Sequence, residues 1–392
     1  MPPEPARCPV STDHPAFSFI DRERDPAEWA GHPPVPLDAD DCDLPTPPHI
    51  VEAMRRAARE PALHRHPRHP GHQGASLLRE AASGFLARRF GVAADPETEV
   101  LVTPGGQEAM AHLALARLDW DDVVLVPDPA PPSYAAWARF CGAEVVRVPL
   151  REENGFLPDL DSIPADVARR AKLFWICYPH DPTGAVATRA FYDELVRFAL
   201  CHDILVASDA AYSEIYYDTE PPPSFLESPG AMACGIEFHS LSKAYTVPGP
   251  GVGFAAGDPR VVGALRAVKT HTDPGTFGAI QHAAMTAFTD TTGYPDRLRA
   301  VFRARVKLLC DGLEEAGLEV LRPRATFHTL VRTPAGTTSE RFSEELRHKA
   351  GVSSVPGTAF GPGGEGYVRL TVCADTDRLT EAVRRIRAAR LV

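Results

Sequence analysis

Short apolar runs alternate with helical patterns through the middle of this 392-residue chain, and that alternation limits what it can fold into. Amphipathic helical stretches separate several of the runs, for example at 107–118 and 190–202. Continuous apolar strands separated by helices form a mostly parallel sheet with both faces covered. The sequence therefore predicts an α/β fold. The expected strands are Val100–Thr103, Val123–Pro127, Glu144–Val148, Leu173–Cys177, Ile204–Ser208, Ile236–Leu241 and Val252–Ala256.

The pattern changes after Pro259, where the chain becomes strongly helical and ends in a mixture of strands and helices. We expect residues 1–45 to form an N-terminal arm and part of a small domain. Residues 46–292 should form the large domain that carries the sheet. Residues 293–392 should form a smaller α+β domain, joined to it by a long helix around 294–316.

Composition excludes several classes of protein. The net charge of −11, with no long basic cluster, argues against nucleic acid as a partner. No run of 18 apolar residues is present, and the acidic, proline-rich N-terminus lacks a signal-peptide pattern, so we expect a cytoplasmic protein without a membrane span. The eight cysteines are scattered without a C-x-x-C pair, which predicts reduced thiols and no metal site.

One lysine stands out for its surroundings. Lys243 follows an apolar run in the segment Ser240-Leu241-Ser242-Lys243, and glycines at 249, 251 and 253 come soon after it. Glycines let a backbone approach a ligand closely. A lysine in a dry pocket can lose its proton and attack a carbonyl carbon, which is the chemistry of Schiff-base enzymes.

Other polar groups follow the ends of predicted strands, where ligands bind in open α/β sheets. Gly105, Gly106 and Gln107 open a helix after the first strand, and the N–H groups there could hold a phosphate. The segment 178–184, Tyr-Pro-His-Asp-Pro-Thr-Gly, follows another strand. Each of these is also compatible with an ordinary tight turn.

Two charged residues sit in apolar strands. Asp209 ends the strand at 204–208, and a carboxylate there is costly unless it meets a cation. Arg369 lies in Tyr367–Thr371, where a guanidinium suggests a carboxylate partner. A helix cap for Asp209 and a surface edge-strand position for Arg369 are the simpler alternatives.

The chain resembles the class I/II aminotransferases over residues 35–392, because five motifs of that family follow one another in order. They are Gly-Gly-Gln, P-x-x-P-T-G, D-x-A-Y, S-x-S-K and the late strand arginine. That family depends on pyridoxal 5′-phosphate (PLP) and has fold type I. The resemblance implies a homodimer that acts on a small amino acid or its keto acid, with residues 46–292 binding the cofactor. It also implies specific roles for individual residues, as follows. Lys243 forms the internal aldimine and moves the Cα proton. Asp209 pairs with the pyridine nitrogen, and Tyr212 forms a hydrogen bond with the phenolic oxygen. Arg369 binds the substrate carboxylate, and the phosphate is held by Gly105, Gly106, Gln107 and Ser240.

The chain departs from the family pattern at four cofactor contacts. Asp181 replaces an asparagine that donates to the phenolic oxygen, and an ionised carboxylate cannot donate. Pro131 replaces the aromatic ring stacked on the pyridine, with Tyr134 and Trp137 nearby but out of register. His66 replaces the tyrosine that reaches the partner subunit's phosphate, and Gly251 replaces the phosphate-binding arginine.

These departures leave alternatives open. The fold could serve another PLP reaction, such as elimination, decarboxylation or oxidation, or it could bind a ligand without PLP. The four histidines of the loop 64–72 could hold a metal or an anion, although a solvated loop is the commoner explanation.

Overall fold

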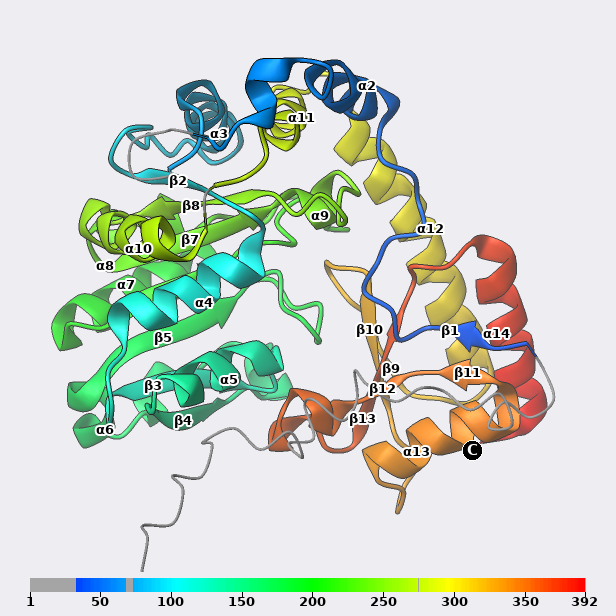
Figure 1. The fold of residues 1–392 in the computed structure, drawn as a ribbon. Helices are drawn as coiled ribbons and strands as arrows, with labels where there is room; N and C mark the ends of the chain where they lie inside the picture. The colour runs from blue at the N-terminus through cyan, green and yellow to red at the C-terminus, as the bar shows by residue number, and fades with distance from the viewer. Residues whose placement is uncertain (1–32, 68–72, 274, 392) are drawn as a thin grey trace, which may run out of the picture.

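The computed structural model describes residues 33–67, 73–273 and 275–391. Its centre is a seven-stranded sheet with helices on both faces, and a smaller sheet lies beside it (Figure 1). The long helix α12 (Tyr294–Glu315) runs along the boundary between the two parts. The α/β prediction is therefore confirmed. The large sheet has the order β2 (Val100–Thr103), β8 (Gly253–Gly257), β7 (Gly235–Ser240), β6 (Leu205–Asp209), β5 (Ala171–Cys177), β3 (Val123–Asp128) and β4 (Glu144–Pro149).

Strand β8 is the exception to the parallel arrangement. It pairs antiparallel with both β2 and β7, whereas all other neighbours in the large sheet are parallel. Parallel strands need a long crossover that usually contains a full helix. Residues 241–252, between β7 and β8, contain no helix longer than the four-residue α9 (Leu241–Ala244), and β8 returns antiparallel to β7.

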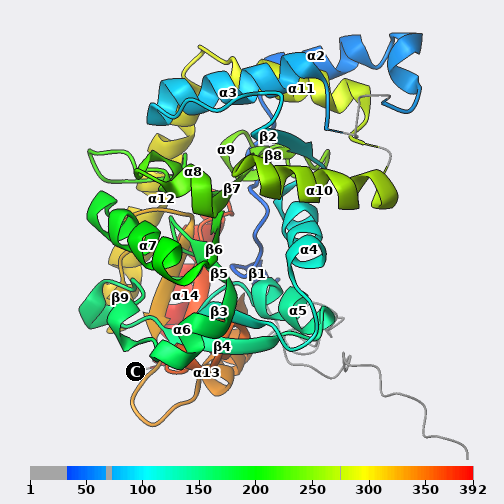
Figure 2. The ribbon, with the colours of Figure 1, turned by 90° about the vertical axis from the view of Figure 1, so that its left-hand side faces the viewer.

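Both faces of the large sheet are buried, and the strand sequences show why. In β5, Phe174 and Ile176 pack into one core while Leu173 and Trp175 pack into the other. This alternation follows from the two-residue period of a strand. One face carries α4 (Gly106–Arg117), α5 (Pro132–Phe140) and α10 (Pro259–Thr272). The core of the other face includes residues of α2 (Pro48–Ala57), α3 (Ser76–Phe90), α6 (Ala165–Arg170), α7 (Arg189–His202), α8 (Ala231–Cys234) and α11 (Gly278–Phe288) (Figure 2).

The smaller part has its own sheet and its own core. An antiparallel sheet in the order β12-β13-β10-β9 packs with α12 around Phe302, Phe327 and Phe342. A short parallel pair, β1 (Val35–Pro36) with β11, ties the start of the described chain to this part. The remaining elements are β9 (Val320–Leu321), β10 (His328–Arg332), α13 (Ser339–Glu345), β11 (Val352–Ser353), β12 (Val355–Pro356), β13 (Tyr367–Thr371) and α14 (Thr376–Ala389).

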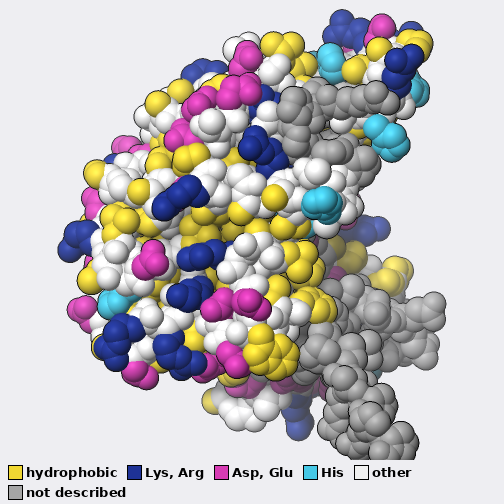
Figure 3. Space-filling model, turned by 60° about the vertical axis from the view of Figure 1, so that its left-hand side comes forward, with side chains coloured by type: hydrophobic (Ala, Val, Ile, Leu, Met, Phe, Trp, Pro, Cys, Tyr) yellow, Lys and Arg dark blue, Asp and Glu magenta, His cyan; other side chains and the backbone are white. Residues whose placement is uncertain are grey.

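The surface gives no sign of a large basic area on the face in Figure 3, where Lys and Arg side chains are interspersed with Asp and Glu. Within the described residues, no helix combines the length and apolarity needed to cross a bilayer.

Candidate active site

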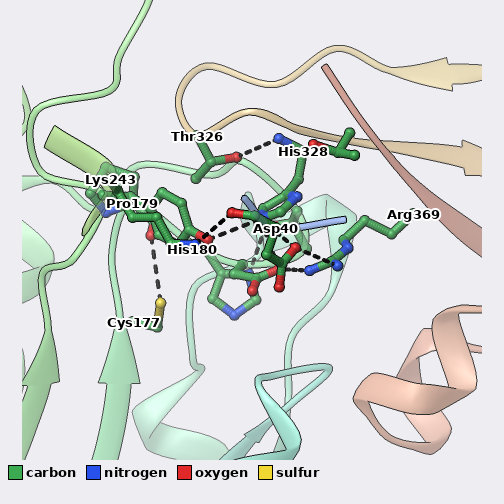
Figure 4. Close-up of polar contacts among 12 residues, drawn as sticks. Asp40, Cys177, Pro179, His180, Lys243, Thr326, His328 and Arg369 are labelled. Carbon is green, nitrogen blue, oxygen red and sulfur yellow. Dashed lines mark hydrogen bonds and ion pairs between the residues drawn. The ribbon is translucent and has the colours of Figure 1, made fainter. Parts of the chain in front are cut away.

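The loops that carry the predicted site residues meet at one edge of the large sheet. Because β2, β7, β6, β5 and β3 all run in the same direction, their carboxyl ends share that edge. The amino end of the antiparallel strand β8 lies there too, which brings Gly251 close to Gly105. Arg369 comes from β13 of the smaller sheet. The site therefore lies between the two parts of the molecule (Figures 1 and 4).

Lys243 lies on α9, immediately after β7. The hydroxyl of Ser240 caps this helix by accepting a 3.2 Å hydrogen bond from the N–H of Ser242. The Lys243 ammonium donates a 2.7 Å hydrogen bond to the carbonyl oxygen of Asp40 and lies 5.2 Å from the ring centre of Phe327. The sequence suggested that Lys243 lies in a dry pocket. The structure differs, because the Lys243 side chain is only partly buried.

Asp209 ends β6 and accepts two hydrogen bonds inside the protein. Tyr134 donates to its Oδ2 at 2.8 Å, and the N–H of Ala211 donates to its Oδ1 at 3.1 Å. Burial raises the pKa of Asp209, while the bond from Tyr134 acts to lower it. Tyr134, which is out of register for stacking on a cofactor, packs instead on Trp175 with ring centres 4.9 Å apart.

Tyr212 follows Asp209 and has a partner that sequence reasoning missed. Its hydroxyl lies 3.0 Å from Nε2 of His328, and both side chains are buried. Burial lowers the pKa of His328 well below its usual value, and the positive charges of Arg369 and Lys243 lower it further. His328 is therefore a neutral imidazole. Nothing in the sequence around His328 indicates that it contacts Tyr212, since it is a polar residue within a strand of the smaller sheet.

Arg369 is held by two carboxylates. Its Nη1 lies 3.0 Å from Oδ1 of Asp181, and its Nη2 lies 2.7 Å from Oδ1 of Asp40 (Figure 4). The ring of Phe360 lies 4.8 Å from the guanidinium carbon. Burial raises the pKa of Asp181 to about 6, against the opposing effect of Arg369. Asp40 was missed because it lies 329 positions from Arg369 in the sequence.

Glycine backbone dominates the end of the site at the start of α4. Gly105 has φ of +100°, a conformation that favours glycine, and the helix begins at Gly106. The N–H groups of a first helical turn have no partner within the helix and carry a partial positive charge. Gly251 has φ of +55°, and a Cβ there would lie 3.3 Å from the carbonyl oxygen of Pro104.

The structure places the remaining sequence candidates as follows. Pro131 precedes α5 and lines a cavity of about 430 Å³ together with Ala130 and Phe360. His66 is exposed on the described chain. His64 is tied locally by a 2.7 Å hydrogen bond to the carbonyl oxygen of Ala58. Residues 68–72, with the other two histidines of that loop, lie outside the described residues.

These groups suit PLP at three of its parts. Lys243 offers an amine for the aldehyde, the half-buried Asp209 carboxylate offers a partner for a protonated ring nitrogen, and the start of α4 offers N–H groups for the phosphate. At the phosphate end the groups named by the resemblance are neutral, since position 251 supplies no side chain. The fit is therefore complete at the reacting end of the cofactor and weaker at its phosphate.

Comparisons with known proteins point the same way. The family model for aminotransferase class I and II matches residues 33–386. The LL-diaminopimelate aminotransferase of Aquifex aeolicus is 43% identical over 375 residues, covering 96% of each chain. That of Desulforudis audaxviator is 45% identical over 353 residues, covering 90% of this chain and 89% of the relative.

Solved structures agree with the sequence relatives. Apo-BacF from Bacillus subtilis superimposes with a TM-score of 0.91 at 35% identity, covering 95% of this chain and 94% of that one. An aminotransferase from Staphylococcus aureus gives 0.89 at 28% identity, covering 96% and 99%. The chain therefore belongs to the class I and II aminotransferases and is a PLP-dependent enzyme of that family.

Proposed function

We propose that this enzyme transfers the amino group of an amino acid whose α-carboxylate binds Arg369, and that Lys243 moves the proton at Cα. The observation that carries the proposal is the convergence of Lys243, Asp209 and Arg369 at one edge of the sheet, from three separate elements. The contacts of Asp40 support this assignment, since its carbonyl oxygen lies 2.7 Å from Nζ of Lys243 and its carboxylate lies 2.7 Å from Nη2 of Arg369.

When bound, PLP supplies a ring that accepts electrons from the substrate carbon. The residues of the chain do the rest. Asp209, half-buried and hydrogen-bonded by Tyr134, would hold a proton on the ring nitrogen. Lys243, from α9, is close enough to the cleft to take a proton and return it. Arg369 would fix the carboxylate, and Tyr212, whose hydroxyl contacts His328 here, would hold the phenolic oxygen.

The substrate class draws on the relatives. The proteins from Aquifex aeolicus and Desulforudis audaxviator are LL-diaminopimelate aminotransferases by name, at 43% and 45% identity. LL-diaminopimelate is therefore the first substrate to test. We also propose a homodimer in which the exposed His66 reaches the partner's phosphate site, and a cytoplasmic location.

Absorbance of the purified enzyme tests the central assignment. After addition of PLP, the wild type should show a visible band from the lysine-bound cofactor, and borohydride should remove it. Lys243→Ala should show no such band, whereas Lys307→Ala, at an exposed lysine on α12, should keep it. Adding LL-diaminopimelate alone should convert the band to that of the aminated cofactor. A wild type that shows no band with excess PLP would contradict the proposal.

A further inference from the structure

The segment 38–43, between β1 and α2, contacts both charged residues of the proposed reaction. The carbonyl oxygen of Asp40 accepts the hydrogen bond from Lys243, and its carboxylate pairs with Arg369. Asp38 is fixed on one side by Ser353, and Asp43 is fixed on the other by Arg305, at 2.5 and 2.8 Å. These contacts fix both ends of the segment that carries Asp40, and Figure 4 shows Asp40 between Lys243 and Arg369.

The two carboxylates on Arg369 differ in how easily they could leave. The Asp181 side chain is 11% exposed and follows a strand of the large sheet. The Asp40 side chain is 47% exposed and belongs to a coil. A carboxylate that leaves Arg369 for water regains hydration readily only if it starts near water. Asp40 is thus the exchangeable partner, and Asp181 is the fixed one.

Charge balance decides how a substrate carboxylate can enter. Arg369 and the free Lys243 amine carry positive charges, Asp40 and Asp181 can carry two negative charges, and the buried His328 that faces both carboxylates at 3.7–3.8 Å adds none. A third carboxylate beside these groups would meet like charge at short range. Exchange of one carboxylate for another on the same Nη2 nitrogen leaves the number of carboxylates in contact with Arg369 at two. Substitution is therefore favoured over addition.

We propose that Asp40 is an internal competitor for the substrate carboxylate: it occupies Arg369 in the free enzyme, and a carboxylate substrate binds by displacing it. This inference rests on the proposed role of Arg369 in substrate binding. A tethered carboxylate competes at a high effective concentration, so simple carboxylates bind weakly. A substrate therefore needs further contacts with the protein to displace Asp40 from Arg369. Asp40 thereby sets which substrates enter.

The experiment measures the affinity of the PLP-reconstituted full chain for propionate by ligand-observed NMR. Asp40→Asn keeps the shape of the side chain and removes its charge, so propionate should bind about ten-fold more tightly than to the wild type. Asp41→Asn removes a neighbouring exposed carboxylate and should change the affinity less than two-fold. Propionamide, a neutral probe of the same shape, should show no gain with Asp40→Asn.

Three results would overturn the proposal: equal propionate affinity in the wild type and Asp40→Asn, an equal gain in Asp41→Asn, or a gain shared by propionamide. Thermal unfolding of each variant checks that the comparison is between folded proteins. The outcome is independent of the absorbance band that tests Lys243. A missing band with a gain for propionate would contradict the proposed function alone, and a normal band without the gain would contradict only the role of Asp40.

Discussion

Tyr134 on α5 donates a hydrogen bond to the Asp209 carboxylate at the end of β6 and lies parallel to Trp175, with 5° between the ring planes. The three residues come from three different elements of the large sheet and its helices. The stacking fixes the direction of the hydroxyl, so the proposed partner of the cofactor nitrogen is positioned by a residue that need not touch the cofactor.

Tyr134→Phe should lower both the stability of the folded protein and its affinity for PLP. A hydrogen bond to a charged group contributes about 1.5–3 kcal/mol, and urea unfolding should show a loss of that order. The pKa of Asp209 should rise, because the bond from Tyr134 lowers it, and PLP should then dissociate more readily in equilibrium dialysis. Tyr178→Phe is the control, because its buried hydroxyl donates to the neutral carbonyl of Phe156. PLP affinity equal in the two variants would contradict the assignment.

Asp181→Asn should change how stability depends on pH. In the folded protein the pKa of Asp181 is raised from 3.8 to about 6. The folded state therefore binds more protons than the unfolded state between about pH 4 and pH 6, and this group lowers stability as pH rises through that range. Asparagine does not titrate. The variant should gain stability relative to the wild type from pH 4 to pH 6, as measured by thermal unfolding, and a constant difference would count against the raised pKa.

Gly251→Arg tests the phosphate end of the site. The left-handed backbone at φ +55° costs a residue with a side chain about 1–2 kcal/mol, so the PLP-free variant should be less stable than the wild type. The new guanidinium should tighten PLP, by about ten-fold if roughly 1.4 kcal/mol is regained. Gly249→Arg is the matched control, since a Cβ there meets nothing within 4 Å. If the PLP-free Gly251→Arg unfolds at the same urea concentration as Gly249→Arg, the strain argument is wrong.

Glu237→Gln should destabilise the protein mainly above pH 5. This carboxylate is buried and receives bonds from Ser208, Ser224, His239 and the N–H of Phe225. Burial acts to raise its pKa, but the bonds from these partners lower it overall. Its stabilisation is therefore present above its unfolded pKa of 4.5 and is lost as pH falls through the lower folded value. Unfolding curves of the wild type and the variant should converge in acid, and curves that stay parallel would contradict this.

The sequence was enough to predict most of the sheet and the convergence of Lys243, Asp209 and Arg369. Apolar strands and their order identify an α/β fold, and such a fold brings strand ends together whatever the side chains are. The direction of β8 could not be predicted, because an apolar run gives the same pattern in a parallel and an antiparallel strand. The partners Tyr134, His328 and Asp40 were missed for another reason. Each meets its partner only through tertiary packing, and the sequence around it carries no local mark of that partner.

The backbone at Gly251 also has an evolutionary consequence. With φ at +55° and a carbonyl oxygen 3.3 Å from where a Cβ would be, any side chain placed there by one substitution begins with a conformational penalty. A lineage descending from this protein could regain a cation at the phosphate end more easily from another position, such as the exposed residue 249, than from 251 itself. A cation introduced at position 251 therefore carries a conformational cost that a cation at position 249 does not.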